Sequence, residues 1–118
     1  MSRDCVDIFS PKVVRSTMGS LYRVPFYVSE DLPRDIGVLK SKGVCFLAAH
    51  PEGSDMYYEA DMRVPTGILI GNEGSGLSPE VSAMADKRIT IPMKGQVESL
   101  NAAMACGILL YEGTRQRR

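Results

Sequence analysis

The sequence lacks most of the features that assign a chain to a special class of protein. It has 14 basic and 14 acidic side chains, so its formal net charge is zero and composition gives no argument for nucleic-acid binding. Cys5, Cys45 and Cys106 are odd in number and widely spaced, which favours reduced thiols over a disulfide framework or a zinc site. No apolar run approaches the length of a membrane span, and no signal-peptide pattern opens the chain. We therefore expect a cytoplasmic protein without a membrane segment or a metal.

The bulk composition is that of an ordinary globular protein. With 118 residues, 44% hydrophobic and 24% charged, the chain is long enough for one domain with a real core. We therefore predict a single domain over residues 1–118.

The first half of the chain predicts alternating helices and strands. Apolar residues recur at three- and four-residue steps after Ser10-Pro11, and β-branched and aromatic runs follow at two places. The predicted elements are a helix from Pro11 to Leu21, a strand over Val24–Val28, a helix over Asp31–Lys42 that stops at Gly43, and a buried strand over Val44–Ala49. A polar connection, His50–Arg63, comes next. Its lone histidine, His50, we interpret as a solvated loop residue rather than a catalytic one.

The second half repeats one plan twice: a strand, a loop and a helix. Ile68–Ile70 reads as a buried strand, three glycines follow (Gly71, Gly74, Gly76), and Ser78 can cap a helix that starts with Pro79. Arg88–Ile91 reads as the next strand, with a Pro92/Gly95 loop and Ser99 as the cap of an apolar helix. Alternating strands and helices predict an α/β fold with a parallel sheet, whose ligand lies where strands end and helices begin.

The glycine-rich loop admits several interpretations. Its Gly-x-x-Gly-x-Gly spacing matches neither the dinucleotide-binding order nor a P-loop, which argues against a phosphate cradle. Glycines there let the backbone approach a flat ligand or turn sharply, and a purely structural turn is the alternative.

Two segments resemble a known family. IGNEGSGL and IPMKGQVESLNAAMA are similar to the second and third motifs of the SpoU-type (TrmH-like) RNA ribose 2′-O-methyltransferases, a branch of the SPOUT superfamily, and SPKVVRSTMGSLYRVP resembles the family's linking segment. The resemblance implies a parallel-sheet domain with helices on both faces and a C-terminal trefoil knot. It also implies S-adenosylmethionine as cofactor, tRNA or rRNA as substrate, and a homodimer.

The resemblance implies site residues as well. The expected cofactor-binding residues are Ala49, Gly71, Asn72, Ile91, Met93 and Leu100, and the expected catalytic group is Glu73, Ser99 and Asn101, with Asn101 and Glu73 favoured over Ser99. Each has a simpler alternative. Ile91 and Leu100 would be plain core residues, Ser99 and Asn101 would serve only the first helical turn, and Glu73 would only face water.

The family's first motif, an Asn followed by a Gly-x-x-x-Arg-type helix start, has no counterpart before Asp4. We therefore expect an N-terminally truncated domain that lacks turnover even if it binds cofactor. Two other classes remain open: an inactive S-adenosylmethionine- or RNA-binding module, and a non-SPOUT nucleotide-binding domain. Basic residues such as Lys12, Arg15 and Arg23 could contact RNA phosphates or belong to a mixed solvated surface.

Overall fold

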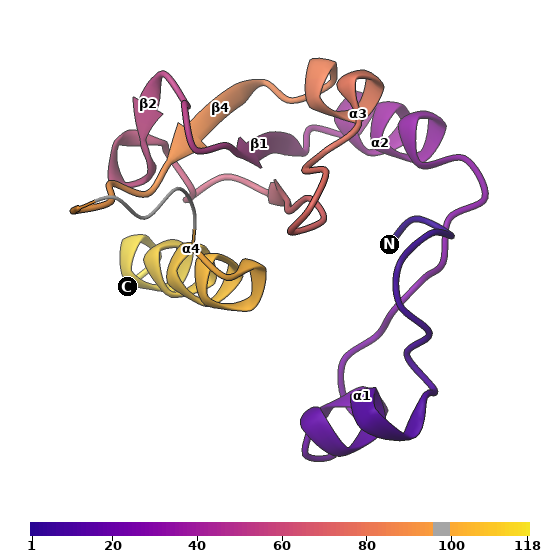
Figure 1. Ribbon diagram of the computed structural model, residues 1–118. Helices are drawn as coiled ribbons and strands as arrows, with labels where there is room; N and C mark the ends of the chain where they lie inside the picture. The colour runs from indigo at the N-terminus through magenta and orange to yellow at the C-terminus, as the bar shows by residue number, and fades with distance from the viewer. Residues whose placement is uncertain (96–99) are drawn as a thin grey trace. The chain divides into compact units, whose positions relative to one another are not determined.

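The computed structural model describes residues 1–95 and 100–118 (Figure 1). The chain forms two compact units, residues 1–35 and residues 36–118, and the boundary falls within helix α2 (Leu32–Ser41). None of the helices in the described ranges has the length and apolar character needed to span a bilayer.

The first unit contains one short helix, α1 (Pro11–Ser16). Ser10 caps it as predicted, since its Oγ accepts a hydrogen bond from the Val13 N–H at 3.4 Å. The helix ends well before Leu21 because Met18 and Gly19 take positive φ angles, 50° and 87°, which no α-helix continues through. A 3₁₀ turn over Ser20–Tyr22 follows.

The predicted strand over Val24–Val28 is wrong. The segment has no strand partner in the described chain, and Pro25 has no N–H to give to a ladder. Its apolar side chains, Val24, Phe26, Tyr27 and Val28, are exposed. Directly after it, Ser29 forms a parallel bridge with Ser2, and the Ser29 N–H donates to the Met1 carbonyl at 2.7 Å.

The second unit is built on a parallel four-stranded sheet. Its strands are β1 (Cys45–Ala49), β2 (Asp55–Met56), β3 (Thr66–Leu69) and β4 (Lys87–Thr90), and their order across the sheet is β2-β4-β1-β3. All three strand pairs are parallel. The predicted α/β class with a parallel sheet is therefore confirmed. β2 lies within the connection that the sequence predicted to be irregular.

Helices cover both faces of this sheet. On one face, Leu47 and Ile89 form a buried cluster with Leu109 of α4 (Ala102–Gln116) and with Ala60 and Met62. The neighbouring residues of β1, Phe46 and Ala48, alternate with Leu47 and are also buried, so the other face is covered too. Figure 1 shows α4 on one side of the sheet and α2 and α3 (Pro79–Ala83) on the other.

A polar contact joins α2 to the start of β4. Lys40 Nζ lies 3.3 Å from Asp86 Oδ1 and donates to the Met84 carbonyl at 2.8 Å. The Phe46 N–H donates to Asp86 Oδ2 at 2.7 Å, and this bond, more than the nearby Lys40 ammonium, lowers the pKa of Asp86. These bonds fix where β4 enters the sheet beside β1.

Candidate functional site

A hollow of about 930 Å³ lies at the carboxyl edge of the sheet, and we call it the motif pocket. It is bounded by the residues that follow β1, β3 and β4 and by the first turn of α4. Of the predicted site residues, seven line it: Ala49, Gly71, Asn72, Glu73, Ile91, Met93 and Leu100. The carboxyl ends of parallel strands, where ligands of open α/β sheets bind, thus carry both sequence motifs.

The loop after β3 is organised by its own asparagine. Asn72 Oδ1 accepts from the Gly74 N–H at 2.7 Å and from the Ser75 N–H at 3.4 Å. Its carbonyl accepts from the Gly76 N–H at 2.8 Å, and Gly76 has a φ of 69°. Asn72 therefore shapes the pocket wall by holding a closed turn, and its side-chain oxygen is already engaged.

Gly71 is required by the same turn. A Cβ added there would lie 2.3 Å from Leu77 N and 2.4 Å from the carbonyl carbon of Gly76, closer than any side chain tolerates. The close approach that this glycine permits is therefore to the returning backbone of its own loop.

Glu73 does more than face water. Its Oε1 accepts a hydrogen bond from the Ala102 N–H at 3.2 Å, in the first turn of α4. A carboxylate at a helix N-terminus is favourable because the free N–H groups there carry partial positive charge. Glu73 thus links the loop of one motif to the helix of the other.

Asn101 is the N-cap of α4, and it does not line the pocket. Its Oδ1 accepts from the Ala103 N–H at 2.9 Å and the Met104 N–H at 3.3 Å. The prediction that Ser99 caps this helix is therefore wrong, because the helix begins at Ala102 with Asn101 as its cap. Ser99 itself lies outside the described residues.

The walls of the pocket are apolar where the two motifs face it. Ile70, Ile91, Met93 and Leu100 line it, and Ile91 and Ile70 also pack against the core cluster. Ile91 is thus both a half-buried core neighbour and a wall of the pocket. Apolar walls with a few polar groups are the usual lining of a small-molecule site.

Two ionisable residues that line this pocket, His50 and Arg88, were not among the predicted site residues. His50 lies in the loop directly after β1 and is half-buried, and its N–H donates to the Ile89 carbonyl at 3.0 Å. Its Nδ1 accepts from the Glu52 N–H at 3.0 Å. The signal that could have found it is its position directly after a buried strand, at the edge where the two motifs converge.

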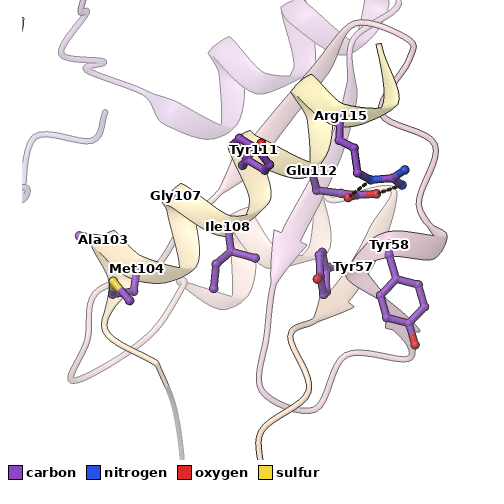
Figure 2. A pocket seen from close by; sticks show the side chains of 9 residues that line it. All are labelled: Tyr57, Tyr58, Ala103, Met104, Gly107, Ile108, Tyr111, Glu112 and Arg115. Carbon is purple, nitrogen blue, oxygen red and sulfur yellow. Dashed lines mark hydrogen bonds and ion pairs between the residues drawn. The ribbon is translucent and has the colours of Figure 1, made fainter. Parts of the chain in front are cut away.

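A second hollow, of about 660 Å³, lies between α4 and the 3₁₀ turn over Tyr57–Glu59, and we call it the α4 groove. Figure 2 shows the side chains that line it, which are Tyr57 and Tyr58 from the 3₁₀ turn and Ala103, Met104, Gly107, Ile108, Tyr111, Glu112 and Arg115 from α4. None of its described lining residues comes from a motif loop. The motif pocket is therefore the better candidate for the functional site. Among the described residues, no group of His, Cys, Asp and Glu is placed to hold a metal ion.

Comparison with known proteins agrees with this geometry. The family model of the SpoU rRNA Methylase family matches residues 1–111. An uncharacterised tRNA/rRNA methyltransferase of Synechocystis sp. is 38% identical over 117 residues, which are 99% of this chain and 43% of that protein. A 23S rRNA (guanosine-2′-O-)-methyltransferase of Shewanella oneidensis is 37% identical and matches over 90% of this chain and 43% of its own length.

The fold has a solved counterpart in the SpoU methyltransferase AviRb from Streptomyces viridochromogenes in complex with the cofactor AdoMet. The two chains superpose with a TM-score of 0.89 at 34% identity, over 99% of this chain and 48% of that one. The chain thus spans somewhat less than half the length of these relatives. Since the family model covers both motifs, the linking segment and all four strands, the chain belongs to the SpoU rRNA Methylase family.

Proposed function

We propose that this chain forms the cofactor-binding part of an S-adenosylmethionine-dependent enzyme that methylates ribose 2′-hydroxyls of tRNA or rRNA. The observation that carries the proposal is the motif pocket, which joins both family motifs at the carboxyl edge of a parallel sheet. The relatives, which are named as tRNA/rRNA methyltransferases and a guanosine-2′-O-methyltransferase, support the reaction, and the AdoMet complex of AviRb supports the cofactor. The place of action would be the cytoplasm.

The pocket has the chemistry that an adenosine group needs. Ile91, Met93 and Leu100 offer apolar walls to the flat base, and backbone groups at Gly71, Ile91 and Leu100 can bond its edge. The pocket is also bounded by Ala49 at the end of β1 and by the turn after β3 that Asn72 closes. When bound, the cofactor supplies an electrophilic methyl group on a sulfonium.

Glu73 and Asn101 act in this proposal by positioning the reactants. Glu73 holds the loop of one motif against the α4 start, and Asn101 fixes the first turn of that helix. A ribose hydroxyl is weakly acidic, so transfer also needs a group that polarises or accepts its proton. The resemblance assigns this step to the arginine of the first motif, which has no counterpart in these 118 residues. We therefore expect the chain to bind the cofactor without turnover.

Two structural features belong to the same proposal. The C-terminal trefoil knot is supported by the family and by the likeness to AviRb. The homodimer is supported by α4, whose Met104, Leu110 and Tyr111 are 61%, 58% and 66% exposed. Exposed apolar side chains of this size on one helix fit an interface with a second copy.

Calorimetric titration of the 118-residue chain with S-adenosylhomocysteine tests the cofactor proposal, with ATP and NAD as comparison ligands. We expect S-adenosylhomocysteine to bind and the two nucleotides not to compete with it. Binding of ATP or NAD without S-adenosylhomocysteine would instead support a nucleotide-binding domain. A methyl-incorporation assay on transcribed rRNA and tRNA tests the second part, and turnover that Asn101→Ala abolishes would contradict the proposed inactivity of this chain.

A further inference from the structure

His50 and Arg88 lie on the same face of two neighbouring strands. β1 and β4 are parallel with Ala48 opposite Arg88, and the bond from the His50 N–H to the Ile89 carbonyl extends this pairing beyond the end of β1. Because side chains alternate along a strand, His50 shares the face of Ala48 and Arg88. Ile89 points to the opposite face, where it packs with Leu109 of α4.

The motif pocket therefore has two chemically different sides. On the α4 side its lining is apolar and includes Ile91, Leu100 and Ala105. On the α3 side it includes His50, Arg88 and Ser82, which are all potential hydrogen-bond donors. A ligand that fills both sides needs a flat apolar part and a polar part rich in acceptors.

The hydrogen bond at Nδ1 fixes what His50 offers to this pocket. Since Nδ1 accepts the Glu52 N–H at 3.0 Å, the proton of the neutral ring is on Nε2. Nε2 is therefore a donor, and no acceptor for it is found within the described part of the chain. The Gly53 N–H donates to the His50 carbonyl at 3.1 Å in the same turn, and this bond helps to fix the backbone that carries the ring.

Arg88 supplies the positive charge on this side. Its neighbour Lys87 pairs with Asp55 at 3.4 Å, whereas Arg88 has no acidic partner in residues 1–95 and 100–118. In the described part of the lining, the other charged residue is Glu73, whose carboxylate already accepts from the Ala102 N–H. An anionic group in the pocket is therefore attracted toward Arg88 and His50 and away from Glu73.

We propose that His50 and Arg88 form a subsite for the carboxylate of the amino-acid part of the cofactor, with Arg88 giving charge and His50 Nε2–H giving direction. This assignment rests on the proposed function, since it presupposes an S-adenosyl ligand with its base on the apolar side. The guanidinium and the imidazole are both donors, and a carboxylate accepts from several donors at once. His50 is thus a binding residue whose tautomer is set by the backbone of the next turn.

The test compares two ligands that differ only in this carboxylate: S-adenosylhomocysteine and its decarboxylated analogue. Calorimetry is run on the 118-residue chain, on Arg88→Gln and His50→Asn, and on the conservative variants Arg88→Lys and His50→Gln. Asn at position 50 retains an acceptor for the Glu52 N–H but loses the distal donor, whereas Gln retains a donor near the Nε2 position. Lys87→Gln is the matched control, because it removes a positive charge from the adjacent position of the same strand.

We expect Arg88→Gln and His50→Asn each to weaken S-adenosylhomocysteine binding roughly ten-fold, the usual effect of losing a hydrogen bond to a charged group. The decarboxylated analogue should bind the parent chain more weakly and lose nothing further in these two variants. Arg88→Lys and His50→Gln should recover part of the affinity, and Lys87→Gln should change neither ligand. Thermal unfolding of each variant shows whether the fold is intact.

Equal losses for both ligands, or no loss for either, would overturn the subsite while leaving the proposed cofactor intact. A variant Arg88→Gln that binds S-adenosylhomocysteine normally but binds transcribed RNA less tightly would overturn it in favour of a phosphate contact. A parent chain that binds neither S-adenosyl ligand would overturn the proposed function and the subsite together.

Discussion

Gly71 lies where the loop after β3 returns across its own path, next to Gly76 and Leu77. The substitution Gly71→Ala should destabilise the fold by about 1–3 kcal/mol, the usual cost of inserting an atom into a filled space. It should also weaken binding of S-adenosylhomocysteine, because the displaced loop is a wall of the motif pocket. Thermal unfolding and calorimetry measure the two effects.

Gly74→Ala is the control in the same loop. A Cβ at that position meets only the side-chain oxygen of Asn72, at 3.3 Å, so the change should cost much less than at Gly71. If the two variants were equally stable and bound the ligand equally well, the tight return of the loop would not be what Gly71 provides.

Asn101 has a structural task that its substitution must disturb. Asn101→Ala removes the acceptor for the Ala103 and Met104 N–H groups and should lower the free energy of unfolding by about 1 kcal/mol. Asn101→Ser restores an N-cap oxygen and should recover most of that stability. Denaturant unfolding measures both.

The pair also separates capping from ligand binding. If Asn101→Ser is as stable as the parent chain and still binds S-adenosylhomocysteine less tightly, the amide has a role at the site beyond the cap. If Asn101→Ala unfolds no more easily than the parent, the cap contributes nothing measurable and the assignment fails.

At the scale of the element, the last turn of α4 is attached to the loop before β3 by polar side chains. Gln116 accepts from the Met62 N–H at 2.8 Å and donates to the Ala60 carbonyl at 3.0 Å, and Arg117 donates to the Met62 and Val64 carbonyls at 2.9 and 3.0 Å. Glu112, only 6% exposed, accepts from Arg115 and Gln116 at 2.8 Å. The C-terminal end of the helix is thereby held against the sheet.

Glu112 makes this attachment sensitive to acid. Its bonds with Arg115 and then Gln116 lower the pKa of its carboxyl from the ordinary 4.5 to about 2. The folded state therefore favours the ionised form, so its stabilisation is complete above the ordinary pKa and is lost as the pH falls from about 4.5 toward 2. We expect Glu112→Gln to be less stable than the parent near neutral pH and to lose less stability than the parent over that acidic range.

Melting temperatures measured across that range check the prediction, and Asp61→Asn is the control. Arg63 also lowers the pKa of Asp61 to about 2, but Asp61 lies two residues from its partner in an exposed turn, so water screens the pair. Asp61→Asn should therefore hardly alter how the melting temperature depends on pH. Parallel profiles for the parent and Glu112→Gln would contradict the role given to Glu112.

The elements that were predictable from sequence are those whose cause is local. Ser78 caps α3 and Pro79 is its first residue. Gly43, with its φ of 92°, lies in the turn between α2 and β1. The apolar run of β1 is buried on both faces of the sheet. The strand β2 was not predictable, because Asp55 and Met56 are paired only by β4, more than thirty residues later.

The residues of the candidate site also fall into two groups, those that local sequence predicts and those that it does not. Pocket walls such as Ile91 and Gly71 follow from their position at strand ends, and the motifs identify them. The roles of Asn101 and Glu73 depend on which N–H groups of α4 are free, and that is decided by the residue at which the helix begins. Arg88 was not predicted as a pocket residue because the face of the sheet on which it lies depends on its pairing with Ala48. That strand register cannot be read from the sequence.

For the whole molecule, the exposed apolar side chains of α4, Met104, Leu110 and Tyr111, predict association. We expect the chain to form dimers in solution, with Leu110→Glu weakening the dimer roughly ten-fold or more, because a charge would be buried where apolar surfaces meet. Sedimentation velocity over a concentration series measures this. Val38→Glu is the matched control, since Val38 is a 46% exposed apolar residue on α2.

A chain that stays monomeric at all concentrations would contradict this prediction. So would a dimer that Leu110→Glu and Val38→Glu weaken to the same extent, because the exposed side chains of α4 would then have no special part in it.

The order β2-β4-β1-β3 also has a consequence for how the protein is made. β2 pairs with β4 alone, and β4 itself is paired on both sides, so residues Asp55 and Met56 have no strand to join until Lys87–Thr90 have been synthesised. Two parallel strands cannot be joined by a tight turn, so their pairing is non-local, and such sheets are slow to assemble. On the ribosome, the sheet therefore closes only after Lys87–Thr90 have emerged, and until then β1 and β3 can pair with each other but leave one apolar face uncovered.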